Sequence, residues 1–327
     1  MKEAYPDSTI DYLVFKGAEK IIGKNPLISR IITVPEKKHN LGLLFSLYRK
    51  YDVAFAAYPS DRTVVAAALA GRRSYGLAYR GHKELLRRLL LHDYHYISDK
   101  DHVVSAIGSL AGMVGASPVN RVTMAYDNAD FLHAGQLPVN SRYVLMHPYS
   151  MKQCKYWPAR YWGELSVLIH QHTNCTVAFT VTPAADDKSY LEEILAYAPQ
   201  NVVQYPCTLS QFAAALKNCT AYVGIDTAAT HIAAAMEVPT VALYGPSLTS
   251  YWAPWPNGCA ERSPFSANKG TQYNGYVTVI QKDWDCVPCN KETCSVSNRN
   301  RMECLEAITP EEVFREVLNN VTRHNRD

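Results

Sequence analysis

The sequence predicts an α/β protein built from two Rossmann-like domains, each with a parallel sheet. The chain has 327 residues, which is too long for one compact core of ordinary size. Short β-like runs alternate with helical patterns along its whole length, as in successive βαβ units. In the second half these runs are mostly apolar, which is typical of strands buried on both faces of a parallel sheet.

The first half predicts four strands separated by helices. The strands are expected at 9–15, 30–34, 51–57 and 74–79, and the helical patterns lie at about 16–23, 40–50 and 62–70. The polar stretch 133–142 is the best candidate for a linker. We therefore place an N-terminal domain at 1–138 and a C-terminal domain at 139–327, with the cleft between them as the expected site.

The second half repeats the alternation more clearly. Its strands are expected at 143–146, 175–181, 201–205, 221–225 and 240–244. Pro158 begins a helix as a first-turn proline, and that helix should bury Tyr161, Leu165, Leu168 and Ile169 on one face. The run Thr-Pro-Glu-Glu at 309–312 predicts a capping box at the start of the last helix.

The composition excludes several classes of protein. The net charge is +3, far too small to indicate nucleic-acid binding, and no recognised nucleic-acid module is present. No apolar run reaches the length needed to cross a bilayer. The first ten residues have no apolar core of the signal-peptide kind, so we expect a cytoplasmic protein.

The stretch 222–247 places polar residues where a parallel sheet binds ligands. Asp226 follows an apolar strand directly, and small side chains at 227–230 leave the first N–H groups of the next helix open to a phosphate. The Asp226 carboxylate would repel phosphate, so it is better suited to accept hydrogen bonds from sugar hydroxyls. The alternative is structural: Asp226 or Thr227 caps the helix, and His231 is a packed core histidine.

Residues 223–247 resemble the donor-site signature of the bacterial heptosyltransferase family, GT-B glycosyltransferases that build the inner core of lipopolysaccharide. The chain keeps the residues Asp226, Thr227, His231, Pro239, Gly245 and Pro246. It has Ala228 where glycine is common, and alanine retains the N–H that would meet a phosphate. The resemblance implies donor binding by Asp226, Thr227, Ala228, Ala229 and His231.

Residues 143–165 resemble the segment of that family that contacts the donor phosphate. The resemblance implies this role for Lys155, and a second phosphate contact for Ser150. A fixed ammonium would stabilise the negative charge that develops on a departing diphosphate; alternatively, a loop lysine is simply a solvated surface charge. Residues 179–187 fall where the family has an acid that holds the ribose, and Asp186 is the nearest acid there.

The resemblance also leaves one expected group outside the sequence. The family's proposed general base lies in a loop before the Ala-Tyr-Pro-Asp segment, and only three residues precede Ala4 here. Inverting transfer needs a group to take the proton of the acceptor hydroxyl. We therefore expect the first strand and the base upstream of Met1, the alternative being a degenerate relative.

Two further groups of residues suggest binding sites. Cys286, Cys289, Cys294 and Cys304 could hold a structural zinc, although the second pair is widely spaced and no histidine joins them. Otherwise no cofactor is required. Basic residues among leucines suit an anionic, lipid-anchored acceptor, or form an ordinary amphipathic surface helix; they are Arg72, Arg73, Arg80 and Lys83.

The sequence therefore predicts a cytoplasmic glycosyltransferase, peripheral to the inner membrane of a Gram-negative-type bacterium. It would transfer heptose from ADP-heptose to the lipid A-linked core oligosaccharide of lipopolysaccharide, with inversion. One alternative is a glycosyltransferase that uses another nucleotide sugar. The other is a non-catalytic nucleotide-sugar-binding relative without the base.

Overall fold

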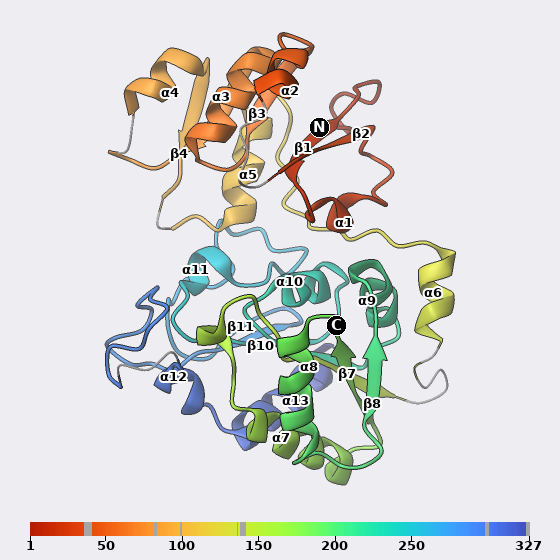
Figure 1. Ribbon diagram of the computed structural model, residues 1–327. Coiled ribbons are helices and arrows are strands. Elements are labelled where there is room, and N and C mark those ends of the chain that lie inside the picture. Colours follow the sequence, from red (N-terminus) through yellow and green to blue (C-terminus); the bar gives the residue numbers. More distant parts are fainter. Residues whose placement is uncertain are drawn as a thin grey trace. The chain divides into compact units, whose positions relative to one another are not determined.

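The computed structural model describes residues 1–35, 41–81, 84–98, 100–135, 137, 142–297 and 301–324. Contacts divide the chain into two units, Met1–Asn120 and Arg121–Asp327 (Figure 1). The boundary expected from the sequence is later, after residue 138. Helix α6 (Asn128–Ala134) lies between the two boundaries and packs on α9 (Leu209–Leu216) of the second unit.

The second unit is built on one seven-stranded sheet, in the order β11-β12-β10-β9-β6-β7-β8. Its strands are β6 (Tyr143–His147), β7 (Thr176–Val181), β8 (Val203–Pro206), β9 (Ala221–Ile225), β10 (Thr240–Leu243), β11 (Gln272–Asn274) and β12 (Val277–Ile280). All neighbouring pairs are parallel except β11–β12. Strands β7 and β8 follow β6 on one side of it in the sheet, and β9, β10 and β12 follow one another on its other side. This is the doubly wound order, with its reversal between β6 and β9.

Helices cover this sheet and bury large side chains against it. They are α7 (Ala159–His172), α8 (Ala185–Leu195), α10 (Ala228–Ala235), α11 (Thr249–Trp252), α12 (Glu303–Glu306) and α13 (Pro310–His324), together with α9 and the short helix η1 (Gln153–Lys155). On α7 the deepest side chains are Trp162, Leu165 and Ile169. Tyr161 and Leu168, which were expected on the buried face, are only half-buried, because Trp162 occupies the core position beside Leu165.

The expected capping box at the start of α13 is present. The Thr309 hydroxyl accepts a hydrogen bond from the N–H of Glu312, and the Glu312 carboxylate accepts one from the N–H of Thr309 (3.3 and 2.8 Å). Glu312 also pairs with Lys282 at 2.7 Å. These contacts fix the end of the helix that packs on α7.

The first unit contains two parallel sheets. One pairs β1 (Asp11–Phe15) with β2 (Arg30–Val34); the other has the order β3-β4-β5, formed by β3 (Tyr51–Ala56), β4 (Gly71–Ala78) and β5 (Asp93–Tyr96). Its helices are α1 (Glu19–Ile22), α2 (Leu41–Ser46), α3 (Asp61–Ala70), α4 (Glu84–Leu90) and α5 (Val103–Gly112). The prediction of two α/β units with parallel sheets is therefore confirmed. No helix in the described part of either unit is long and apolar enough to cross a membrane.

Candidate functional site

The candidate site lies where the strand order of the second unit reverses. Ligands of open α/β sheets bind beyond the carboxyl ends of the strands at this position. The loop after β6 contains Ser150 and Lys155, the junction after β9 contains Asp226 and Thr227, and the loop after β10 contains Ser247. Because β6, β9 and β10 are adjacent and parallel, all three connections leave the same edge of the sheet.

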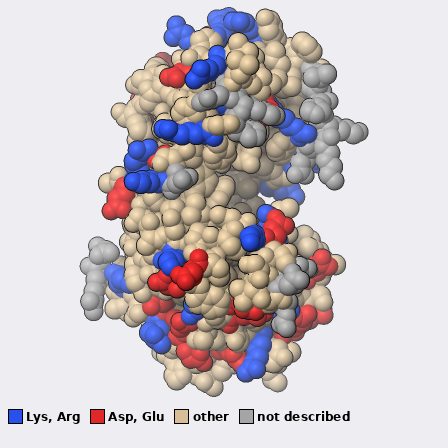
Figure 2. Space-filling view, turned by 90° about the vertical axis from the view of Figure 1, so that its left-hand side faces the viewer, with Lys and Arg blue, Asp and Glu red and all other residues tan. Residues whose placement is uncertain are grey.

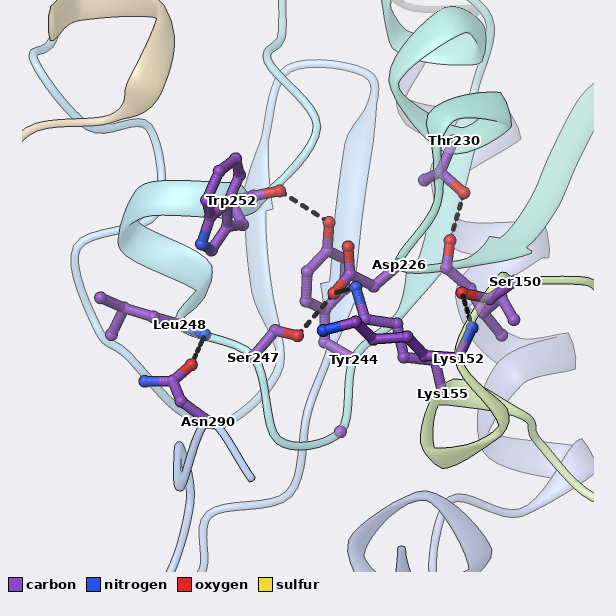
Figure 3. A network of polar contacts seen from close by, with 12 residues as sticks. Ser150, Lys152, Lys155, Asp226, Thr230, Tyr244, Ser247, Leu248, Trp252 and Asn290 are labelled. Atoms are coloured by element: carbon purple, nitrogen blue, oxygen red, sulfur yellow. Dashed lines mark hydrogen bonds and ion pairs between the residues drawn. The ribbon is translucent and has the colours of Figure 1, made fainter. Parts of the chain in front are cut away.

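Asp226, in the connection after β9, contacts one side chain from each of the other two connections (Figure 3). The Lys155 Nζ atom lies 2.6 Å from Asp226 Oδ2, and the Ser247 hydroxyl donates a hydrogen bond of 2.5 Å to the same oxygen. The Asp226 side chain is 9% exposed and that of Lys155 23%. Lys155 is therefore not an ordinary solvated loop lysine: it is fixed against a buried carboxylate at the reversal of the sheet.

The loop that carries Ser247 is itself fastened by its neighbours. The buried Gln281 amide donates to the carbonyl oxygens of Gly245 and Ser247 (2.7 and 2.9 Å). On the other side, the Asn290 N–H donates to the Pro246 carbonyl at 2.8 Å. A Cβ atom at Gly245 would lie 2.7 Å from a Leu305 side-chain carbon, so a larger residue there would displace the loop. The Ser247 hydroxyl is thus placed before any ligand arrives.

The first turn of α10 leaves two N–H groups open. Thr227 is the N-cap residue, but its hydroxyl makes no capping hydrogen bond. Its carbonyl accepts from the N–H groups of Thr230 and His231. No hydrogen bond within the described residues uses the N–H groups of Ala228 and Ala229. The capping alternative therefore does not describe Thr227, and the start of α10 has the free donors that favour an anion.

Two histidines near the site are held neutral by burial. Burial lowers the pKa of His231, and Lys155 lowers it further, against an opposing effect of Asp226. Burial also lowers the pKa of His147, at the end of β6, to about 4. The His147 Nδ1 atom lies 2.8 Å from the Thr180 hydroxyl. Both rings are therefore neutral near pH 7 and add no charge to the site.

A cavity of about 810 Å³ opens beside this cluster within the second unit. Its size is within the range of small-molecule and cofactor pockets. The lining residues include Ser150 and Thr227, so the cavity reaches the loop after β6 and the start of α10. The aromatic side chains of Tyr156 and Tyr190, from the same unit, also line the cavity. The cavity can therefore hold a ring system together with an anionic group.

Two neighbouring acids at the start of α8 line this cavity in different ways. Asp187 is half-buried and accepts hydrogen bonds from the hydroxyls of Tyr156 (3.0 Å) and Thr182. Asp186 is exposed in the first turn of α8, and its carboxylate makes no hydrogen bond or ion pair with another described residue. The Asp186 carboxylate is thus free to accept a hydrogen bond from a ligand hydroxyl, whereas the Asp187 carboxylate is already hydrogen-bonded to Tyr156 and Thr182.

The structure separates the basic residues expected on the acceptor side. Arg72 and Arg73 lie at the amino end of β4, where Arg72 pairs with Asp52 at 3.2 Å. Arg80 follows the carboxyl end of the same strand, and its guanidinium lies 5.5 Å from the Tyr96 ring centre. These residues therefore do not form one cluster. Lys83 lies outside the described residues.

The four cysteines considered for zinc do not form a metal site. Among the described residues, no group of three or more His, Cys, Asp or Glu side chains is arranged to hold a metal ion. Cys286 is exposed, while Cys294 and Cys304 are buried in the apolar core of the unit. Burial raises the pKa of Cys304 to about 12, with smaller contributions from the thiols of Cys289, Cys294 and Cys286. The structure gives no support to the zinc hypothesis.

Three side chains near the cluster had not been assigned to the site from the sequence: Ser247, His147 and Tyr156. A signal was available for Ser247, since it follows the Gly-Pro pair directly after a buried strand. For the other two, only the folded contacts reveal the position: Tyr156 reaches Asp187, and His147 reaches the neighbouring strand β7.

Known proteins resemble the chain over most of its length. The family model described as "Glycosyltransferase family 9 (heptosyltransferase)" matches residues 51–298. Lipopolysaccharide heptosyltransferase 3 of Escherichia coli is 25% identical over 279 residues, which are 79% of this chain and 80% of that protein.

Solved structures of similar fold cover nearly the whole chain. The E. coli ADP-heptose lipopolysaccharide heptosyltransferase II superposes with a TM-score of 0.72 at 20% identity, covering 99% of this chain and 92% of the other. A family 9 glycosyltransferase from Veillonella parvula superposes with a TM-score of 0.77 at 18% identity, covering 98% and 90%. These likenesses confirm the GT-B fold.

Proposed function

The chain belongs to glycosyltransferase family 9, and we propose that it transfers a heptose from ADP-heptose to the inner core of lipopolysaccharide. As a member of that family it is a glycosyltransferase, as the sequence resemblance implied. The donor is supported by the cluster at the sheet reversal and by the ADP-heptose named for the E. coli structural neighbour. The acceptor is supported by the E. coli relative, a lipopolysaccharide heptosyltransferase.

The donor diphosphate is assigned to Lys155 and the start of α10. In direct transfer the acceptor hydroxyl gives its proton to a general base, which we do not assign among the described residues, and its oxygen bonds to the anomeric carbon with inversion. The bond between that carbon and the phosphate oxygen breaks, and ADP leaves with the extra negative charge. The Lys155 ammonium and the free N–H groups of Ala228 and Ala229 are donors suited to that charge. Ser150, which lines the same cavity, is assigned a further phosphate contact. With these donors in place, we propose that transfer needs no metal cofactor.

Asp226 is assigned to the sugar, with Thr227 and His231 beside it. Its Oδ2 atom already accepts from Lys155 and Ser247, which leaves Oδ1 for the hydroxyls of the transferred heptose. When the diphosphate arrives, it competes with Asp226 for the Lys155 ammonium. The Ser247 hydroxyl then keeps the carboxylate in place while the lysine turns to the phosphate.

The nucleoside is assigned to the cavity of about 810 Å³. Asp186 is free to accept from the ribose hydroxyls, and the rings of Tyr156 and Tyr190 provide apolar surface for a base. Asp187 supports this arrangement indirectly, because it fixes the Tyr156 hydroxyl.

The acceptor is assigned to the first unit, at the carboxyl edge of the β3-β4-β5 sheet. Arg80 lies at this edge and is suited to a negative charge on a lipid A-linked core oligosaccharide. Such an acceptor is anchored in a membrane, so we propose a cytoplasmic enzyme that is peripheral to the inner membrane and has no nucleic-acid partner.

The observation that carries this proposal is the convergence of Lys155, Ser247 and the open α10 N-terminus on Asp226. The test combines nucleotide binding with transfer. Calorimetry with ADP, UDP and GDP should show the tightest binding for ADP, and Lys155→Gln should weaken it at least tenfold. The rate of transfer from ADP-heptose to heptose-free, lipid A-linked core oligosaccharide should likewise be higher for the wild type than for Lys155→Gln.

The possible results separate the alternatives. Tighter binding of UDP or GDP, with transfer from the corresponding nucleotide sugar, would replace ADP-heptose by another donor. Equal ADP binding by the wild type and Lys155→Gln would refute the phosphate assignment. Arg160→Gln, which removes an exposed cation of the same unit, is the matched control and should change neither measurement.

A further inference from the structure

Several large apolar side chains of the first unit are exposed on neighbouring helices. Phe45 on α2 is 66% exposed, and Tyr48 just after it 58%. Leu85 and Leu89 on α4 are 71% and 73% exposed. Since they are four residues apart, these two leucines lie on the same side of the helix. We call the surface formed by these four residues the apolar face.

Helices α2, α3 and α4 form one layer. The connections β3–α3–β4 and β4–α4–β5 both join adjacent parallel strands and move in the same direction across the sheet. Because such crossovers are right-handed, α3 and α4 cover the same face. Helix α3 contacts both α2 and α4 (Figure 1). The exposed side chains of α2 and α4 therefore flank α3 within a single surface.

The same segment carries the basic excess of the whole chain. Residues 41–98 contain nine Lys and Arg against four Asp and Glu, while the rest of the chain contains 24 against 26. Arg49, Lys50, Arg62 and Arg88 are exposed: the first two directly follow Tyr48, Arg88 directly precedes Leu89, and Arg62 is in the first turn of α3. Figure 2 shows that Lys and Arg predominate over this unit, whereas the second unit carries charges of both signs.

Exposed apolar side chains framed by cations match one environment in particular, the headgroup region of an anionic bilayer. The apolar side chains enter the acyl boundary while the cations meet lipid phosphates. We propose that the α2–α3–α4 layer docks on an anionic membrane surface through Phe45, Tyr48, Leu85 and Leu89. This inference rests on the proposed lipid-anchored acceptor, to which such docking would bring the enzyme.

The test is co-sedimentation of the full chain with vesicles of phosphatidylcholine, with and without phosphatidylglycerol. Binding should need the anionic lipid and should weaken as salt is raised. The double variant Leu85→Ser/Leu89→Ser should bind at least about tenfold more weakly, because two leucines lose their apolar environment. Arg49→Gln/Lys50→Gln should weaken binding by about fivefold for each cation. Leu132→Ser, which changes a leucine of the second unit that is 77% exposed, should bind as the wild type does.

Other outcomes would overturn the inference. Equal binding by the wild type and Leu85→Ser/Leu89→Ser would place the contact elsewhere. A wild-type dimer that the leucine variant converts to a monomer, seen in analytical ultracentrifugation, would assign the face to a second copy of the chain. The docking proposal and the proposed function can be refuted independently. Vesicle binding without heptose transfer would refute only the proposed function. Transfer to the acceptor without vesicle binding would refute only the docking face.

Discussion

Removal of the Ser247 hydroxyl should impair transfer while the fold stays intact. The hydroxyl donates a 2.5 Å hydrogen bond to Asp226, whose Oδ2 atom also meets Lys155. A hydrogen bond to a charged group contributes about 1.5–3 kcal/mol. Applied to the sugar contact that we propose for Asp226, this contribution predicts that Ser247→Ala lowers kcat/KM for the donor by about 10- to 100-fold, at roughly 1.4 kcal/mol per factor of ten.

The assay compares kcat and KM for five variants: Ser247→Ala, Ser247→Thr, Ser263→Ala, Asp226→Asn and the double variant Asp226→Asn/Ser247→Ala. Ser247→Thr keeps a hydroxyl and should recover most of the activity. Ser263→Ala removes another buried hydroxyl of the same unit, which donates to a backbone carbonyl at 2.7 Å, and should change stability more than activity. In an Asp226→Asn background, Ser247→Ala should have much less effect, because the two residues act as a unit. An undiminished loss in that background would refute the claim that Ser247 acts through Asp226.

Three further results are expected. Asp226→Ala should abolish transfer yet unfold at nearly the wild-type temperature in calorimetry, and full activity would contradict the sugar contact. The free energy of unfolding should fall between pH 6.5 and about 4, since there the unfolded chain binds a proton at His147 that the folded chain does not. The His147 part of this loss reaches up to about 3 kcal/mol and should be absent from urea titrations of His147→Gln. Thr309→Ala should lower the free energy of unfolding by about 1 kcal/mol through loss of the capping box. Thr322→Ala, whose hydroxyl bonds a carbonyl within the last turns of α13, should have a smaller effect in the same urea titration.

The central strands of the second unit, β6, β7, β9 and β10, could be predicted because they are buried on both faces. Strand β9 is wholly buried and occupies the expected residues 221–225, and β6 extends the expected strand by one residue, to His147. Parallel strands in such a position are continuous apolar runs, so their pattern depends little on tertiary detail.

Strands β5, β11 and β12 were not predicted. Strand β5 reads Asp-Tyr-His-Tyr and is only half-buried at the edge of its sheet, so it has no apolar run. Strand β11 has three residues, and β12 beside it has four, Val-Thr-Val-Ile. A run of three residues does not differ from a loop segment in the sequence, and the four residues of β12, although buried, were not identified as a strand. Their pairing with β10 and with each other defines them.

The site shows the same dependence on strand order. Asp226 and Lys155 could be inferred because each lies in a stretch with a recognisable pattern, but Ser247 joins them only because β10 lies next to β9. The basic residues of the first unit show the reverse case. Arg73 and Arg80 are close in sequence, yet an extended strand rises about 3.3 Å per residue, so the five steps of β4 from Arg73 to Ala78 already span roughly 17 Å. Residues that are close in sequence form one site only where the chain turns between them, and β4 does not turn. Among the arginines expected from the sequence on the acceptor side, Arg80 alone follows the carboxyl end of β4, and our proposed acceptor contact is therefore restricted to it.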